Sequence, residues 1–211
     1  MILIFKFSYA KICFIEIYLK GIKNMNINIV LASASPRRKE LLKLITSEFD
    51  IIPSDVDETL PEEIKSENAA EYLAKIKARS IGNIENTAVI GCDTVVVIDG
   101  NILGKPKNRE QCRSMLTSLS GKTHFVYTGV CIIYNSIEYS FTEKTEVIFY
   151  NLSEMEIEEY IETGEPFDKA GGYGIQGKGA LLVKGINGDY FNVVGLPVST
   201  LNRKLKEIIS H

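Results

Sequence analysis

Short apolar runs alternate along the chain with segments in which apolar residues recur at helical spacing. The apolar runs predict β-strands at residues 27–31, 49–53, 88–98, 125–134, 137–149 and 180–183. The helical segments predict α-helices that start at Pro36 and that span 66–81, 108–119, 153–163 and 197–209. In a chain of 211 residues, this alternation predicts an α/β fold, built as one large domain or two closely joined lobes.

Turn and cap residues mark several boundaries of these elements. Asp99-Gly100 follows the most apolar strand and predicts a two-residue type I′ hairpin. Asn108 with Gln111, and Ser153 with Glu156, have the spacing of helix capping boxes.

The first 24 residues differ from the rest of the chain. They are rich in Ile, Phe and Tyr, but the charges of Lys6, Lys11, Glu16 and Lys20 are too many for a transmembrane helix. The segment also lacks the cleavage pattern of a signal peptide. Because the first strand begins two residues after Met25, we expect Met25 to be the natural start and 1–24 to be a misassigned or dispensable extension. Residues 25–211 are then expected to form a single domain.

Composition narrows the class of function. A formal net charge of −3 leaves no broad basic surface, which argues against a nucleic-acid binder or a protein of anionic membranes. The four cysteines form no C-x-x-C pair, so neither a zinc ribbon nor a disulfide framework is indicated. Free thiols are typical of a reducing compartment, so we expect a cytoplasmic protein.

Histidine is scarce in this chain. The only two are His124 and His211, which excludes a multi-histidine zinc site and leaves His124 as the one possible imidazole base. Chemistry must therefore rest on carboxylates, lysines and arginines, with Mg²⁺ or Mn²⁺ as a fitting oxygen-liganded metal.

A polar segment after the first strand has the chemistry of a phosphate-binding loop. Ser35 is the expected N-cap and Pro36 the first residue of a helix whose first turn holds three basic residues, 37–39. Each such charge costs about 0.3–1 kcal/mol beside the helix dipole unless an anion offsets it. The hydroxyls of Ser33 and Ser35, free backbone N–H groups and two guanidinium groups suit a phosphate chain. The alternative is a solvated basic turn.

A carboxylate interrupts the most apolar strand. Asp93 would cost several kcal/mol there unless it were paired or metal-bound, so it is a candidate for the reaction centre rather than a structural buried Asp. The hairpin after this strand folds Lys105 back toward Asp93.

Two further groups have open interpretations. Asp55, Asp57 and Glu58 are either a solvated loop or ligands for a hard cation. Lys77 shares the apolar face of the helix at 66–81, where it either extends to solvent or reaches a functional anion.

A glycine-rich loop completes the candidate site. Residues 172–177 read G-x-G-x-x-G, but this loop follows a helix and leads into the strand predicted at 180–183, so no dinucleotide fold is indicated. The glycines suit tight turns beside a ligand, to which Asp168, Lys169 and Gln176 could be presented.

The chain resembles the Maf family of nucleoside triphosphate pyrophosphatases from about residue 26 to its C-terminal helix. The resemblance rests on the motifs at residues 31–38, 91–94, 104–106, 118–121 and 168–177. It implies an inosine triphosphate pyrophosphatase-like (Maf/Ham1) fold, with an elongated mixed sheet in two lobes around a deep cleft, often as a homodimer. It also implies metal-dependent cleavage of a nucleoside triphosphate to monophosphate and pyrophosphate.

The resemblance carries roles to individual residues. Asp93 matches the catalytic acidic residue, and the other cleft residues matched are Glu58, Lys77 and Lys105. The phosphate-binding loop corresponds to Ser33, Ser35, Arg37 and Arg38. The pattern of Arg37, Thr94 and Gln176 resembles the dTTP/UTP-cleaving subgroup; the 7-methyl-GTP subgroup has Trp, Gln and Glu there.

The resulting hypothesis is an in-line hydrolysis at the α-phosphorus. Asp93 and Glu58 hold Mg²⁺ or Mn²⁺ and position the water, while lysine and arginine side chains neutralise the phosphate oxygens. One alternative is a nucleotide-sensing regulator of cell division that binds without turnover. Another is a house-cleaning enzyme for modified nucleotides.

Overall fold

A computed structural model describes residues 27–210, and the expected extension at 1–24 lies outside this range. One mixed sheet has the strand order β2-β1-β3-β5-β6-β7, with β4 paired to β3. The strands are β1 (Asn28–Leu31), β2 (Asp50–Ile51), β3 (Thr87–Ile98), β4 (Asn101–Leu103), β5 (Thr123–Tyr134), β6 (Ile137–Phe149) and β7 (Val183–Asn187). β1 is parallel to β2 and β3, and all other pairs are antiparallel.

Six α-helices and four short 3-10 helices are found in the described part of the chain. The α-helices are α2 (Pro36–Leu42), α3 (Ala69–Ile81), α4 (Arg109–Leu119), α5 (Glu154–Glu162), α6 (Tyr190–Val194) and α7 (Val198–Ile209). The 3-10 helices span Ser66–Asn68, Glu165–Asp168, Ala170–Gly172 and Gly177–Leu182. Between residues 27 and 210, no helix has both the length and the apolar character that a bilayer crossing requires.

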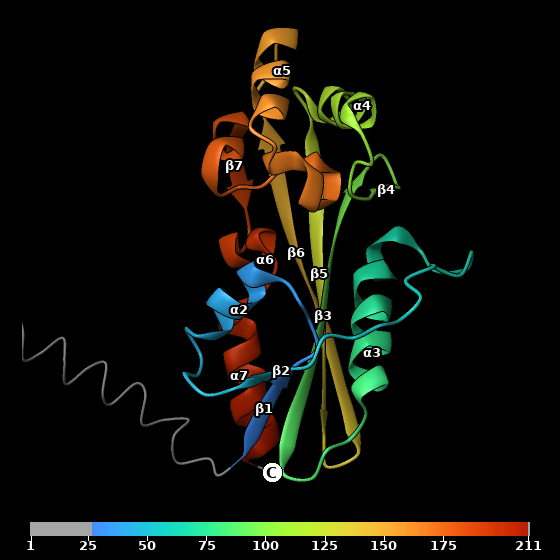
Figure 1. Cartoon of the computed structure of the whole chain (residues 1–211), viewed down its shortest axis with the longest axis vertical. Helices are drawn as coiled ribbons and strands as arrows, with labels where there is room; N and C mark the ends of the chain where they lie inside the picture. Colours follow the sequence, from blue (N-terminus) through green and yellow to red (C-terminus); the bar gives the residue numbers. More distant parts are fainter. Residues whose placement is uncertain (1–26, 211) are drawn as a thin grey trace, which may run out of the picture.

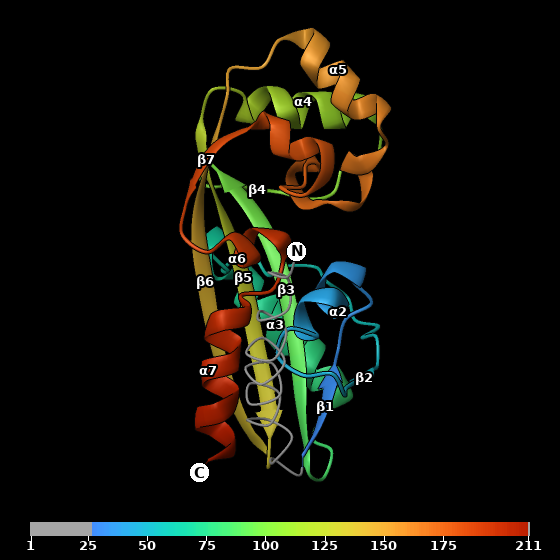
Figure 2. The same ribbon diagram turned by 90° about the vertical axis from the view of Figure 1, so that its left-hand side faces the viewer.

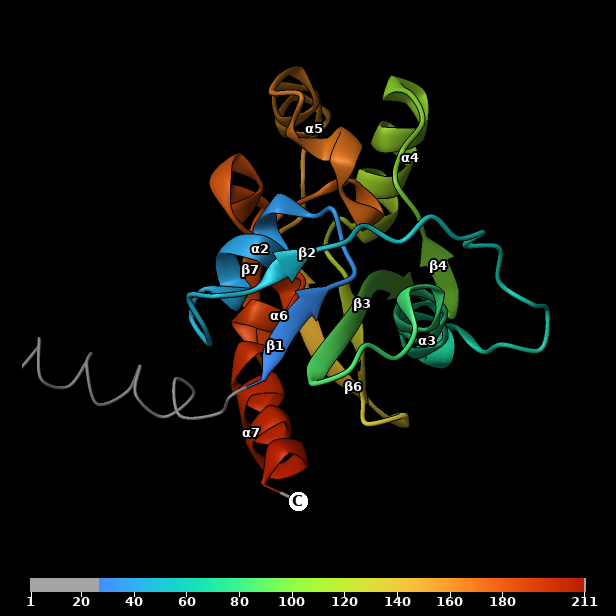
Figure 3. The ribbon, with the colours of Figure 1, turned by 60° about the horizontal axis from the view of Figure 1, so that its bottom comes forward.

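The molecule is elongated, because β3, β5 and β6 run along its long axis (Figure 1). One end, the lower lobe, holds β1, β2, α2, α3 and α7, with α3 and α7 on opposite faces of the sheet (Figure 3). The other end, the upper lobe, holds β4, β7, α4 and α5 (Figure 2). The expected α/β fold with an elongated mixed sheet and two lobes is confirmed.

The side chains of β3 show how one strand serves both lobes. Successive residues point to opposite faces of a sheet. On one face, Ile90 and Cys92 belong to the apolar core against α7, whereas Val96 and Ile98 belong to the core of the upper lobe. Thr94 lies on the same face between these two cores. The only polar positions in the middle of this strand therefore lie where the two lobes meet.

Two glycines bring α3 unusually close to the sheet. A Cβ on Gly91 would lie 2.2 Å from the carbonyl oxygen of Ala74, and one on Gly129 would lie 2.3 Å from the backbone of Ala70. Gly91 and Asp93 share the face that α3 covers, and Gly129 pairs with Asp93 across the strands. This close approach places α3 directly against the part of β3 that carries Asp93.

Most local predictions are confirmed. Asp99 and Gly100 have φ values of 50° and 79°, as a type I′ turn requires. Ser153 and Glu156 form a complete capping box. Asn108 caps α4, but the Gln111 amide oxygen accepts from the backbone N–H of Lys107, so the second half of the expected box is missing.

One predicted strand is wrong, and one helix was not predicted. The strand expected at 180–183 is wrong, because a 3-10 helix continues to Leu182 and β7 begins at Val183. The backbone at Gly179 packs so tightly against Gly174 that a Cβ would lie 2.2 Å from its carbonyl oxygen. This contact explains why the chain curves here and does not run straight as a strand. The short helix α6 was not predicted at all.

Candidate active site

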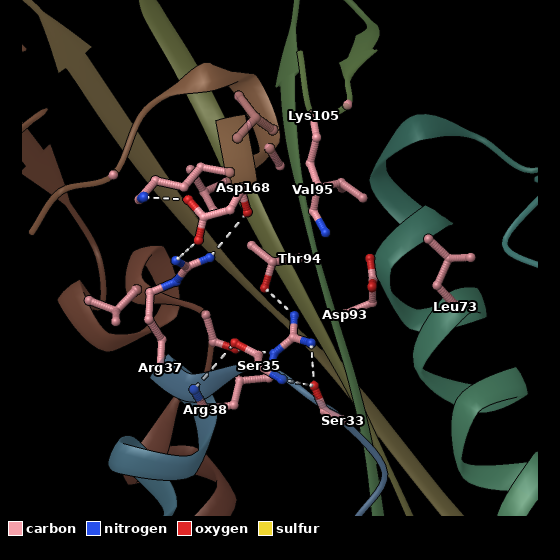
Figure 4. Close-up of a pocket in the computed structure, with 18 of the residues that line it drawn as sticks. Ser33, Ser35, Arg37, Arg38, Leu73, Asp93, Thr94, Val95, Lys105 and Asp168 are labelled. Carbon is pink, nitrogen blue, oxygen red and sulfur yellow. Dashed lines mark hydrogen bonds and ion pairs between the residues drawn. The ribbon is translucent and has the colours of Figure 1, made fainter. Parts of the chain in front are cut away.

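A cleft of about 640 Å³ lies where the two lobes meet. Figure 4 shows side chains from α2, β3 and the segment around Asp168 directed into it. Twelve of the predicted site residues line this cleft: Ser33, Ser35, Arg37, Arg38, Glu58, Lys77, Asp93, Thr94, Lys105, Asp168, Lys169 and Gln176. Asp55 and Asp57, the other two carboxylates of the Glu58 loop, do not line it. Residues up to 143 positions apart in the sequence (33 to 176) therefore meet at one site.

Lys77 lies between two carboxylates. Its Nζ is 2.5 Å from Oδ1 of Asp93 and 2.8 Å from Oε1 of Glu58. Lys77 and Asp93 are only 7% and 9% exposed, whereas the Glu58 side chain is 57% exposed on its loop. Lys77 thus reaches an anion and does not extend to solvent. The pairing also offsets the cost of burying a carboxylate in β3.

Lys105 lies on the chain that leaves β4. Figure 4 shows its side chain extending into the cleft toward the part of β3 that carries Asp93. Within residues 27–210, Lys105 forms no ion pair, so its ammonium group is available to an anionic ligand in the cleft. The hairpin therefore brings Lys105 and Asp93 to the same cleft, as expected, without a direct ion pair.

Arg38 is fixed by three acceptors. Its Nε donates to the carbonyl oxygen of Gly195 (2.9 Å), Nη1 to Oγ of Ser33 (3.1 Å) and Nη2 to Oγ1 of Thr94 (3.1 Å). A guanidinium group carries five N–H bonds. One N–H on each terminal nitrogen of Arg38 therefore remains for a ligand. Ser35 caps α2 by accepting from the Arg38 backbone N–H.

An ion pair joins the two lobes across the cleft. Nη1 of Arg37 lies 2.7 Å from Oδ2 of Asp168, and Nζ of Lys169 lies 2.5 Å from Oδ1 of the same carboxylate. Partial burial raises the pKa of Asp168, but the hydrogen bonds from Lys169 and Arg37 outweigh it and keep the pKa below its usual value. Asp168 thus holds two cations at the rim of the cleft.

The glycine-rich loop needs its glycines for backbone shape. Gly171 and Gly172 have φ values of 71° and 69°, and Gly171 lies against Val96 with no room for a side chain. The loop leads to Gln176, which is exposed at the cleft. Its amide forms no hydrogen bond with other residues of the described range, and so can donate and accept toward a ligand.

His124 is not a base in this cleft, contrary to the possibility raised by the sequence. It is fully buried, and its Nε2 lies 2.7 Å from the hydroxyl of Tyr173, which lines the cleft. Burial lowers the pKa of His124 to about 4. Phe149 packs edge-on against both rings. His124 therefore anchors the glycine-rich loop to β5.

Several residues that line the site or support it carry no signal in the sequence. Gly195 contributes only a carbonyl oxygen, and Gly129 contributes only the absence of a side chain. Thr128 lies inside an apolar strand and hydrogen-bonds to Thr94 at 2.9 Å. A Thr directly opposite Thr94 could have been found only after the register of β3 and β5 was known.

The mixed sheet gives the protein a HAM1-like α/β fold. The fold is similar to the structure of a HAM1 protein from Coxiella burnetii, with a TM-score of 0.50 and 16% identity over 86% of this chain and 99% of that chain. Residues 28–208 match the family described as Maf-like protein, and the chain belongs to the Maf family.

Relatives in this family share about half of their residues with the chain. A dTTP/UTP pyrophosphatase of Geobacillus sp. (strain WCH70) is 51% identical over 181 residues, which are 85% of this chain and 97% of the relative. A dTTP/UTP pyrophosphatase of Bacillus mycoides (strain KBAB4) is 50% identical over 183 residues, 86% of this chain and 96% of the relative.

Proposed function

We propose that the protein hydrolyses dTTP and UTP to the nucleoside monophosphate and pyrophosphate. The observation that carries this proposal is the convergence of carboxylates and cationic donors on one cleft. Asp93 and Glu58 stand on one side of it, and Arg38 with two spare N–H bonds stands on another. The names of relatives that are about 50% identical over nearly their whole length support the same reaction.

The triphosphate binds to the cationic side of the cleft. Arg38 offers one N–H from each terminal nitrogen, a fork that suits two phosphate oxygens. Lys105 adds a charge that no carboxylate of the described residues neutralises. Arg37 and Lys169 are shared with Asp168 at the rim, where they face the incoming anion.

The residues present fit a divalent cation of the Mg²⁺ type. Within residues 27–210 no three His, Cys, Asp or Glu side chains gather as a complete metal site. Mg²⁺, however, is commonly held by one or two carboxylates together with water and substrate phosphates. Asp93 and Glu58 already converge on a cation, the ammonium of Lys77. When bound there, the metal would supply charge neutralisation for the phosphate oxygens.

The protein's own groups then carry the displacement. Asp93 orients the attacking water and accepts its proton, and the water oxygen forms a bond to the α-phosphorus. The bond between that phosphorus and the oxygen bridging to the β-phosphorus breaks, and pyrophosphate leaves. Lys77, Lys105 and Arg38 stabilise the negative charge on the phosphate oxygens.

Discrimination between nucleotides rests on three residues that line the cleft. The free amide of Gln176 can pair with the donors and acceptors of a pyrimidine edge. Arg37 and Thr94 are the other two positions at which the dTTP/UTP-cleaving pattern differs from the 7-methyl-GTP pattern. The homodimer and the cytoplasmic location stay predictions.

The test is pyrophosphate release from dTTP, UTP, 5-methyl-UTP, CTP, GTP, 7-methyl-GTP and ATP with Mg²⁺ or Mn²⁺. The proposal expects release from dTTP and UTP above the others. Release from another nucleotide alone would retain the reaction and refute the pyrimidine assignment. Tight binding of dTTP without any release would refute the enzyme and favour a regulator. Faster release from 5-methyl-UTP than from dTTP would favour a house-cleaning role.

A further inference from the structure

A chain of hydrogen bonds through two hydroxyl groups runs from the cleft into the sheet. Nη2 of Arg38 donates to Oγ1 of Thr94 at 3.1 Å. The hydroxyls of Thr94 and Thr128 are 2.9 Å apart. Oγ1 of Thr128 donates to the backbone carbonyl oxygen of Asn192 at 3.0 Å. Figure 4 shows the cleft end of this chain, where Thr94 meets the Arg38 guanidinium.

The direction of every proton in this chain is fixed. A guanidinium can only donate, a carbonyl oxygen can only accept, and each hydroxyl has one proton. The proton of Thr128 therefore goes to the carbonyl of Asn192. The proton of Thr94 must then go to Thr128, and the Thr94 oxygen accepts from Arg38. As long as this chain is intact, Thr94 has no proton to donate to a ligand in the cleft.

The far end of the chain is rigidly held. Asn192 is fully buried, and its Nδ2 donates to the carbonyl of Val126 (3.1 Å) and to Oγ1 of Thr145 (2.9 Å). Thr128 is also fully buried and does not line the cleft. Gly195, which follows α6, accepts from Nε of Arg38. Helix α6 thus determines the position of Arg38 by two routes, one direct and one through the two threonines.

The pair of threonines interrupts an otherwise apolar face. Thr94 and Thr128 are directly opposite each other in β3 and β5. On the same face, Val126 belongs to the core of the upper lobe and Val130 to the core of the lower lobe. Apolar side chains would pack at such a boundary, so packing alone does not call for two hydroxyls. Their shared feature is the line of hydrogen bonds to Arg38.

We propose that Thr128 is a positioning residue, which fixes the acceptor on Thr94 and through it the two spare N–H bonds of Arg38. This inference rests on the proposed function, in which Arg38 binds the phosphate chain. On this account Thr94 influences the nucleotide through Arg38 and not by a direct contact.

The test compares three variants with a control. Thr128→Val and Thr94→Val each remove one link of this line of hydrogen bonds, and Thr128→Ser keeps the hydroxyl. The control, Thr87→Val, removes a buried hydroxyl at the far end of β3 that donates to the carbonyl oxygen of Glu85. We expect Thr128→Val and Thr94→Val each to raise the KM for dTTP about fivefold, the size of one net hydrogen bond, with kcat changed less than about twofold. Thr128→Ser and Thr87→Val should keep the wild-type KM.

A second comparison asks whether Thr128 acts through Arg38. In an Arg38→Ala background, Thr128→Val should have no further effect on KM, since residues that act as one unit are not additive. An equal fold-change in both backgrounds would overturn the proposal. An unchanged KM in Thr128→Val, or the same loss in Thr128→Ser as in Thr128→Val, would overturn it as well. If Thr128→Val does not fold, the KM values of the other two variants decide: Thr94→Val should raise the KM for dTTP, and Thr128→Ser should leave it unchanged.

Calorimetric binding of α,β-imido-dTTP, which cannot be cleaved at that bond, separates this inference from the proposed function. Wild-type protein that binds the analogue without hydrolysing dTTP refutes the enzyme, and about fivefold weaker binding by Thr128→Val would then still support the positioning role. Wild-type protein that hydrolyses dTTP, with no change in Thr128→Val, overturns the positioning role alone.

Discussion

Acid should destabilise this fold through His124, well before the carboxylates titrate. His124 is fully buried, and burial lowers its pKa from 6.5 to about 4. The folded state therefore disfavours the imidazolium, whereas the unfolded chain takes up a proton near pH 6.5. Between these two pKa values the unfolded state binds more protons, so stability rises with pH and is lost as the pH falls. At pH values well above 6.5 the contribution is constant.

The size of the effect follows from the two pKa values. Linkage gives a loss of about 2 kcal/mol in the free energy of unfolding between pH 7 and pH 5, and about 3 kcal/mol by pH 4. Histidine is the side chain that ordinarily titrates in this window. The carboxylates with lowered pKa, such as those of Glu138 and Asp168, contribute stability that is lost only at more acid pH.

Urea unfolding at pH 7 and pH 5 measures this loss directly. The matched variant is His124→Gln, which cannot titrate but can still hydrogen-bond to Tyr173. We expect the free energy of unfolding of this variant to change by less than about 0.5 kcal/mol between pH 7 and pH 5. That of the wild type should fall by about 2 kcal/mol. Equal losses in both proteins would refute the argument that burial of His124 sets the acid limit.

Two further perturbations follow from the packing of α3 and from the two carboxylates. Gly129→Ala would place a Cβ 2.3 Å from the backbone of Ala70. We therefore expect the free energy of unfolding, measured with urea, to fall by about 1–3 kcal/mol, and the activity to be lower. Gly185→Ala, which meets nothing within 4 Å, is the control, and an equal loss in both would contradict the argument. Glu58→Gln should weaken Mn²⁺ binding about tenfold or more without lowering the melting temperature, since Glu58 is mostly exposed. Mn²⁺ paramagnetic resonance measures the affinity, and unchanged binding would remove Glu58 from the metal site.

The residues of the cleft could be predicted from the sequence because local chemistry marks them. Asp93 is conspicuous as a carboxylate in an apolar strand, and Arg37 and Arg38 are conspicuous as cations in the first turn of a helix. Each of these signals is visible within a window of a few residues. They need no knowledge of which segments meet in the fold.

The features that the sequence did not reveal depend on contacts between segments that are distant in the sequence. The sequence left Lys77 with two interpretations, because the carboxylates it meets are 16 and 19 positions away. Gly129 and Thr128 matter only through the strand register, which a run of apolar residues does not specify. The strand expected at 180–183 failed for the same reason, since the path of Gly179 is set by its packing against Gly174.

The most direct test of the account is pyrophosphate release from dTTP by Asp93→Asn. Asp55→Asn is the matched control, because Asp55 is an exposed carboxylate of the Glu58 loop that does not line the cleft. The account predicts that Asp93→Asn loses at least about a hundredfold in kcat, as expected for a lost acid–base group, and that Asp55→Asn keeps the wild-type rate. A folded Asp93→Asn protein with wild-type turnover would contradict the assignment of the reaction to this cleft.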